Sequence, residues 1–307
     1  MPDSFLVTVP ATTANIGPGF DCLGAALTLY NRFRFTALDA APGTLEILIS
    51  GKDADRVSTE PDNLAYQAFD IFYQKQQQAP PAVCIEIELD VPLARGLGSS
   101  STAIVGGLLG ANAIADYPLT SEEITNLAIA IEGHPDNVVP AILGGCHLAA
   151  QDADNRWVIC DVPWHDSIKA IVAVPDFELS TVAARKVLPT HYTKADAIFN
   201  MAHLGMLLRG LETGNEQWLK AALRDRIHQP YRQTLIPGFE TVQQASQAAG
   251  ACGLVISGAG PTLLAITKEA IATSICNEML QAWQNPKFKV DTQILSLDFD
   301  GALIEPN

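Results

Sequence analysis

The sequence has 307 residues, 48% hydrophobic and 17% charged, which is enough apolar mass to form a core in two domains or one large one. Its formal net charge of -15 argues against nucleic acid and anionic membrane surfaces as partners, because both repel an acidic protein. No stretch approaches the ~20 apolar residues of a membrane span, and the first residues lack a basic start and an apolar run. We therefore expect a soluble cytoplasmic protein, whose six scattered cysteines are reduced and buried.

Strands are predicted early in the chain, at residues 5–9, 32–37 and 44–49. Residues 82–91 alternate apolar with polar or acidic side chains, which predicts a strand with one face in water. Between them, Asp62 is a candidate cap for a helix that runs to about Gln77. The chain then reaches two prolines, which stop a helix.

Two further helices are predicted before residue 135. The segment 100–115 is apolar on nearly every side and carries Gly106, Gly107 and Gly110, which predicts a buried helix that another element approaches closely. Thr120 with a glutamate three residues later forms a capping box for the next helix. Gly133 is its predicted end.

The second half of the chain mixes the same element types. We predict strands at 169–174 and 254–257, and helices at 193–211, 215–223, 239–249 and 269–283. The elements do not alternate strictly, which favours an α+β protein over a doubly wound parallel sheet. We place a domain boundary near residue 165, giving domains 1–165 and 166–307.

Three segments rich in glycine each follow an apolar strand. In residues 10–24, Asn15 and Asp21 could point at a ligand, or could satisfy the backbone of an ordinary turn. Residues 92–102 join a strand through a glycine loop to a helix start, which is a recurrent way to hold phosphate. The alternative interpretation of the same pattern is a serine-rich helix cap without a ligand. The segment lacks a Walker lysine, and Ser101 occupies the third glycine position of a dinucleotide fingerprint. Residues 257–262 form a third loop or a tight turn.

Glu132 is predicted to lie in the last turn of a helix, just before the run Gly133-His134-Pro-Asp136-Asn137. A carboxylate there opposes the negative end of the helix dipole, at a cost of ~0.3–1 kcal/mol. A bound cation would reverse that sign, whereas exposure to solvent would only reduce it. His134 taken alone is more often structural than catalytic.

In this order, the segments resemble the GHMP kinases, which include galactokinase, mevalonate kinase and homoserine kinase. Residues 92–102 are similar to the phosphate loop of that superfamily, and residues 257–262 to its third motif. The opening segment and the Glu132–Asn137 run look like the homoserine kinase branch. The resemblance implies an N-terminal domain like ribosomal protein S5 and a C-terminal ferredoxin-like domain, with the site between them.

The resemblance also implies that ATP and Mg2+ bind near the second segment. Asn63 would contact the adenine, while Ser100 and Glu132 would hold the metal. The residues that would surround the nucleotide are Pro92, Leu93, Ala94, Arg95, Gly96, Leu97, Gly98, Ser99, Ser100 and Ser101.

For the second substrate, L-homoserine, the resemblance implies a pocket of eight residues. Arginine forks suit its carboxylate, Asp21 suits its ammonium group, and the amide of Asn137 could orient its hydroxyl. Asn137, His134 and Glu132 are the predicted catalytic residues. The pocket residues are Asn15, Asp21, His134, Asn137, Thr181, Arg185, Arg232 and Gly258.

An asparagine cannot accept a proton, and homoserine kinases look able to work without a base. Phosphoryl transfer has a loose transition state, so positioning and charge neutralisation supply most of the catalysis. Asp136 is an alternative candidate for a general base. The alternatives are a mevalonate- or sugar-type kinase, a nucleotide-binding regulator without activity, and an NAD-dependent dehydrogenase. The resemblance also implies a homodimer and a role in threonine biosynthesis.

Overall fold

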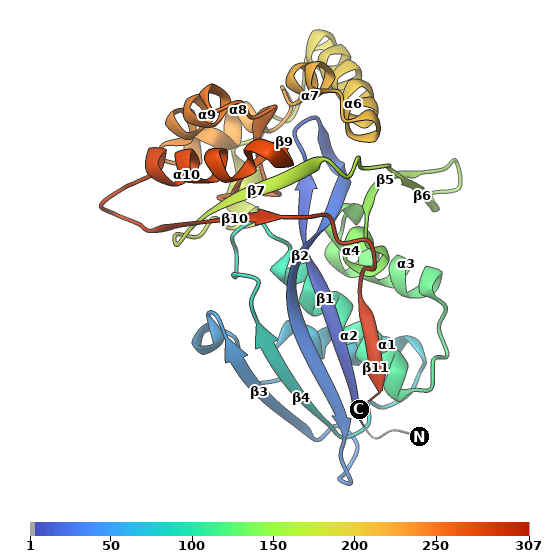
Figure 1. Cartoon of the computed structure of the whole chain (residues 1–307). Helices are drawn as coiled ribbons and strands as arrows, with labels where there is room; N and C mark the ends of the chain where they lie inside the picture. Colours follow the sequence, from blue (N-terminus) through green and yellow to red (C-terminus); the bar gives the residue numbers. More distant parts are fainter. Residues whose placement is uncertain (1–3, 307) are drawn as a thin grey trace.

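Two β-sheets organise the chain, and the computed structural model describes residues 4–306 (Figure 1). The first sheet has the order β11-β1-β2-β4-β3, with β5 paired to β2 and β6 to β5. Its strands are β1 Ser4–Asn15, β2 Gly19–Ala37, β3 Leu45–Gly51, β4 Val83–Leu89, β5 Cys146–Gln151, β6 Trp157–Asp161 and β11 Leu303–Pro306. The second sheet, β10-β7-β9-β8, is antiparallel. Its strands are β7 Ile168–Pro175, β8 Gly253–Ile256, β9 Leu263–Lys268 and β10 Val290–Leu295.

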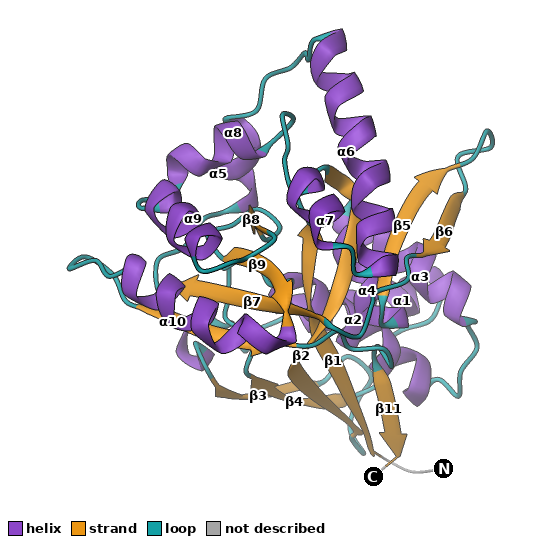
Figure 2. Ribbon diagram, turned by 45° about the horizontal axis from the view of Figure 1, so that its top comes forward, coloured by secondary structure: helices purple, strands orange, loops and turns teal. Residues whose placement is uncertain are grey.

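Helices pack against both sheets (Figure 2). Those of the first part are α1 Leu64–Lys75, α2 Ser99–Ile114, α3 Ser121–Glu132 and α4 Pro135–Leu143. Those of the second are α5 Thr181–Lys186, α6 Lys194–Thr213, α7 Glu216–Ala222, α8 Gln229–Arg232, α9 Phe239–Ala248 and α10 Ala272–Ala282. Helix and sheet are both present without a strict alternation, so the predicted α+β class is confirmed. Among the helices of residues 4–306, none is long and apolar enough to cross a membrane.

The last strand returns to the first sheet. Strand β11 pairs with β1 in antiparallel register, from Phe5 opposite Pro306 to Thr8 opposite Leu303. The last strand therefore lies beside the first, as Figure 1 shows. The division into 1–165 and 166–307 stays a prediction. We predicted from the first residues that the chain lacks a secretion signal. Residues 1–3 of that segment lie outside the described part.

The first glycine-bearing segment is a β-hairpin, not the loop that we predicted after residue 9. Strand β1 continues to Asn15 and β2 begins at Gly19, with Ala11 opposite Leu27 and Ala14 opposite Gly24. The small and β-branched side chains of residues 11–14 are fully buried, and such residues fit a strand covered on both faces. The hairpin carries the ligand candidates into the middle of the molecule.

The cap of α1 also differs from the prediction. Asn63 accepts hydrogen bonds at Oδ1 from the backbone N–H groups of Ala65 and Tyr66, so it is the N-cap. The side chain of Asp62 accepts instead from the hydroxyl of Ser58. Both residues are good caps, and the turn geometry at 58–63 decided between them.

Helix α4, which contains Pro135 and Pro140, was not predicted. Pro135 stands in the first turn, where the missing N–H costs nothing. The capping box of α3 and the glycine at its end were predicted correctly: Thr120 and Glu123 cap it, and Gly133 ends it with a left-handed φ of 91°.

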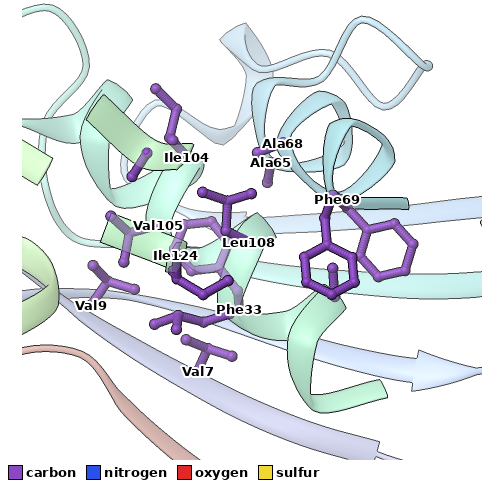
Figure 3. Packing of buried hydrophobic residues seen from close by; sticks show 14 of the residues in the cluster. Val7, Val9, Phe33, Ala65, Ala68, Phe69, Ile104, Val105, Leu108 and Ile124 are labelled. Carbon is purple, nitrogen blue, oxygen red and sulfur yellow. The ribbon is translucent and has the colours of Figure 1, made fainter. Parts of the chain in front are cut away.

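Helix α2 lies in the core between α1 and the first sheet (Figure 3). Its side chains Ile104, Val105 and Leu108 belong to one buried cluster with Val7, Val9, Phe33, Ala65, Ala68, Phe69 and Ile124. The predicted close approach at its glycines is confirmed. A Cβ on Gly106 or Gly110 would meet a phenylalanine ring at 2.5 or 2.2 Å, and one on Gly107 would lie 2.1 Å from the carbonyl oxygen of Ala65.

Substituting Gly107→Ala is expected to lower the free energy of unfolding by about 1–3 kcal/mol, because a backbone atom cannot move aside cheaply. Urea unfolding measures this. The matched control is Gly205→Ala in α6, where an added Cβ meets nothing within 4 Å. That variant should gain up to about 1 kcal/mol from helix propensity. Equal midpoints for the two variants would contradict the packing argument.

Candidate active site

The three glycine-bearing segments converge at one place, although more than 200 residues separate the first from the third in the sequence. The hairpin meets the phosphate loop where Thr12 N–H donates to the Leu97 carbonyl (3.1 Å). It meets the third segment where Gly258 N–H donates to the Ala14 carbonyl (3.1 Å). The hydroxyl of Ser257 closes the triangle by donating to the Gly96 carbonyl (2.6 Å). The structure thus brings together what the sequence keeps apart.

A cavity of about 520 Å³ opens beside this junction. Most of the residues predicted for the two substrates line it. Pro92 and Leu97 do not; the side chain of Leu97 is buried in the core instead. The predicted residues that line the cavity are Asn15, Asp21, Asn63, Leu93, Ala94, Arg95, Gly96, Gly98, Ser99, Ser100, Ser101, Glu132, His134, Asn137, Thr181, Arg185, Arg232 and Gly258.

The phosphate loop has a backbone that only certain residues allow. Ala94, Gly96 and Gly98 have φ values of 52°, 81° and 71°, in the left-handed region. Gly98 is the N-cap of α2, and the first intrahelical bond joins Thr102 N–H to its carbonyl. The N–H groups just before that bond have no partner within the helix, so an anion can bind there.

Substituting Gly98→Ala is expected to weaken ATP binding more than tenfold, because the new Cβ would lie 2.0 Å from the hydroxyl oxygen of Thr12 and φ is positive. Titration with a fluorescent ATP analogue measures the loss. The control is Gly43→Ala, which has a φ of 82° but open space around it. If both variants bind the analogue equally well, crowding at Gly98 does not shape the loop.

The guanidinium of Arg95 is bound by other groups of the chain. It donates to the carbonyl oxygens of Pro175 (2.9 Å), Leu93 (2.7 Å) and Asp176 (2.6 Å), and forms an ion pair with Glu178 (3.1 Å). The phosphate loop is therefore tied to the end of β7. A nucleotide contact through this side chain stays a prediction.

Glu132 is the last helical residue of α3, and it faces α2. Its Oε1 accepts from the hydroxyl of Ser101 at 3.1 Å. Burial raises the pKa of this carboxyl group above its usual value, against the opposing effect of His134. Ser100, which we predicted as the metal ligand beside it, is exposed and lines the same cavity.

Among residues 4–306, no group of three or more histidine, cysteine or acidic side chains could hold a metal ion. A Mg2+ ion bound with ATP does not need such a group. It keeps several waters and is commonly held by one or two carboxylates together with phosphate oxygens. The half-buried carboxylate of Glu132, beside the hydroxyls of Ser100 and Ser101, fits that donor set.

The helix start at α4 arranges three polar side chains. His134 Nδ1 lies 2.7 Å from Oδ1 of Asp136, and Asn137 Nδ2 lies 3.4 Å from the same atom. The bond to Asp136 raises the pKa of His134. The amide oxygen of Asn137 accepts from the hydroxyl of Thr12 at 2.8 Å. Each of these side chains is therefore held by another, and the buried Asp136 is their shared acceptor.

Asp21 and Arg185 form a bidentate ion pair, at 2.8 and 2.9 Å. This pair joins the hairpin to α5. Arg232 is only 2% exposed, and no carboxylate of residues 4–306 forms an ion pair with it. The two arginines that we predicted for one carboxylate therefore differ, since only Arg185 has its charge neutralised by the protein.

The two predicted asparagine contacts are both engaged within the chain. Asn15 donates to the Gly258 carbonyl (2.9 Å) and accepts from Asp21 N–H (2.9 Å). Asn63 caps α1 and donates to the Ser58 carbonyl (2.7 Å). Each asparagine lines the cavity, so it can shape the site even while its polar atoms are bound.

Sequence reasoning missed Phe20 and His228, which contact Arg232. The signal for His228 was its spacing of four residues before Arg232 at a short helix, which places both on one face. No local signal marked Phe20, which lies more than 200 residues away in the sequence.

Two protein-family models match the sequence of this chain. The model of the "GHMP kinases N terminal domain" matches residues 63–145, and that of "GHMP kinases C terminal" matches residues 207–285. Two such domains, with a phosphate loop beside the cavity, define an ATP-dependent small-molecule kinase with the GHMP fold. The predicted S5-like N-terminal and ferredoxin-like C-terminal domains are the units of this fold.

Similar proteins show which family of GHMP kinases the chain belongs to. The chain is 60% identical to a homoserine kinase of Microchaete diplosiphon, over 97% of this chain and 96% of the relative. It is 58% identical to one of Trichodesmium erythraeum, over 98% of each. A crystal structure of homoserine kinase from Cytophaga hutchinsonii superposes with a TM-score of 0.89 at 27% identity, covering 99% of this chain and 98% of that one. The chain belongs to the homoserine kinase family.

Proposed function

We propose that the chain transfers the γ-phosphoryl group of ATP to the side-chain hydroxyl of L-homoserine, giving O-phospho-L-homoserine for threonine biosynthesis. The identity of 60% over nearly the full length to a homoserine kinase carries this proposal. It is supported by the cavity, where a phosphate loop and a buried arginine without an acidic partner face the same space.

In this proposal the phosphates of ATP lie at the start of α2. The unpaired N–H groups and the helix dipole favour their negative charge, and adenine extends toward Asn63. Ser100 and Glu132 would hold Mg2+, which neutralises charge on the phosphates when bound. Within the chain, Ser101 keeps the Glu132 carboxylate turned toward the loop.

The amino-acid substrate would lie between the hairpin and α5. Its carboxylate would meet the guanidinium of Arg232 and its ammonium group the carboxylate of Asp21. Because Asp21 is paired with Arg185 in the free protein, a zwitterion would share that pair rather than meet two isolated charges. Thr181, Gly258 and Asn15 complete the wall.

Positioning then supplies the chemistry. Asn137 is held by the hydroxyl of Thr12 and by Asp136, which leaves one amide hydrogen for the acceptor hydroxyl, beside His134. Asp136 already accepts from His134, which suits it to orienting that ring rather than to removing a proton. The proton can leave late, to a phosphate oxygen or to water, because the transition state is loose.

The test is ADP release by the purified chain with Mg-ATP and L-homoserine, compared with L-serine, mevalonate and galactose. Turnover with L-homoserine in clear preference is expected. Turnover only with mevalonate or galactose would support kinase activity but contradict the proposed amino-acid pocket. Binding of ATP without any turnover would favour a regulator.

A homodimer in the cytoplasm is also proposed, from the family resemblance alone. Light scattering on the full chain checks the stoichiometry. A mass of about twice the 32.8 kDa of one chain is expected, and a mass equal to one chain would contradict the dimer.

A further inference from the structure

The guanidinium of Arg232 is buried, and within residues 4–306 no carboxylate forms an ion pair with it. Burial, and then the nearby guanidinium of Arg185, lower the pKa of Arg232, against the opposing effect of the carboxylates of Asp21, Asp136 and Asp225. Burying a cation without a paired anion is costly, so the fold must hold this group firmly. Since Arg232 lines the cavity, its orientation decides where an anionic group of a ligand can bind.

Neutral groups of the protein hold this cation. Its Nη1 donates to the carbonyl of Gly258 at 3.0 Å, and its Nε donates to that of Ala184 at 3.3 Å. Nη1 also lies 3.4 Å from Nδ1 of His228. Carbonyl and imidazole acceptors fix the direction of the guanidinium and leave its positive charge available.

His228 can accept from Arg232 because of its own second contact. The ring is completely buried, and its Nε2 lies 2.8 Å from the carbonyl oxygen of Gly17. A carbonyl only accepts, so Nε2 carries the hydrogen and Nδ1 keeps its lone pair toward the arginine. The hairpin thereby sets the tautomer of a residue more than 200 positions away.

Phe20 forms an aromatic wall against both arginines. Its ring stacks on that of His228, with centroids 5.1 Å apart and planes at 22°. The guanidinium carbons of Arg232 and Arg185 lie 5.1 and 5.7 Å from its centre. A ring face attracts cations, so one apolar side chain can keep two mutually repelling arginines in place without neutralising either.

We propose that Phe20 and His228 are positioning residues that aim the Arg232 guanidinium at the carboxylate of the acceptor. They thereby set a preference for α-amino acids over alcohols without that group. This inference rests on the proposed homoserine kinase function. It adds two residues that do not themselves line the cavity.

The first test is Phe20→Leu in the full chain. The KM for L-homoserine should rise about tenfold, as expected for one cation–π contact in a desolvated place. The KM for Mg-ATP should change less than about twofold, a threshold well below that tenfold effect. Phe20→Tyr, which keeps the ring face, should restore the affinity. Phe299→Leu, at a side chain 63% exposed, is the matched control. Thermal melting shows whether each variant folds.

A double-mutant cycle separates positioning from general damage. Arg232→Lys keeps a cation but loses the planar group that stacks and forks. If Phe20 acts through Arg232, Phe20→Leu should add little to the KM for L-homoserine in the Arg232→Lys background. Additive losses, or equal losses for both substrates, would overturn the inference.

His228 is tested by the same readout. His228→Asn can place an amide oxygen where Nδ1 stood, whereas His228→Leu offers no acceptor. The asparagine variant should therefore keep a lower KM for L-homoserine than the leucine variant, with similar melting temperatures. Equal KM values would remove His228 from the proposal. A wild-type chain that phosphorylates none of the offered amino acids would instead refute the proposed function.

Discussion

Substituting Glu132→Gln is expected to reduce kcat with Mg-ATP and L-homoserine about a hundredfold or more, because a neutral amide binds the metal much more weakly than a carboxylate. Glutamine keeps the size of the side chain and can still accept from the hydroxyl of Ser101. ADP release measured over a range of Mg2+ concentrations should show a raised metal requirement. Glu122→Gln, at an exposed position in the first turn of the same helix, should behave like the wild type.

The stability of this variant should change in the opposite direction. Burial raises the pKa of Glu132 in the folded chain, so its folding contribution is fully present below the unfolded value near 4.5 and is lost as pH rises through the folded value. At neutral pH in a chelator, Glu132→Gln should therefore resist urea at least as well as the wild type. Lower stability together with wild-type kcat would mean that Glu132 serves the fold and not the metal.

Features that depend on a few neighbouring residues could be predicted from the sequence. The capping box at Thr120, the buried helix with three glycines and the strand-loop-helix at residues 92–102 were all found in the structure. Each depends on backbone preferences or on side-chain period within about one or two turns of chain. The helix at 135–143, which contains two prolines, was not predicted.

Pairing across the chain could not be predicted in the same way. The sequence indicated that Asp21, Arg185 and Arg232 belong to one pocket, but only through a family resemblance. It gave no sign that the first two neutralise each other while the third stays unpaired. That difference depends on how the hairpin, α5 and α8 pack together, and no local period encodes such packing.

The unpaired charge leads to an unusual expectation for Arg232→Met. Removing the guanidinium should lower kcat/KM for L-homoserine at least about a hundredfold, as for loss of one member of a desolvated ion pair. An apolar chain of similar length would replace a buried cation that no carboxylate contacts as an ion pair within residues 4–306. The free energy of unfolding should therefore stay equal or rise. Function would then be lost without loss of stability.

Initial rates at varied L-homoserine, together with urea unfolding without ligand, test both halves of this expectation. Arg224→Met, which removes an exposed arginine, should leave both quantities near wild type. In the wild type, saturating L-homoserine should raise the unfolding midpoint, because a ligand that binds only the folded state stabilises it. In Arg232→Met that shift should vanish. If the variant unfolds far more easily than the wild type, the arginine supports the fold, and its unpaired charge is not reserved for the substrate.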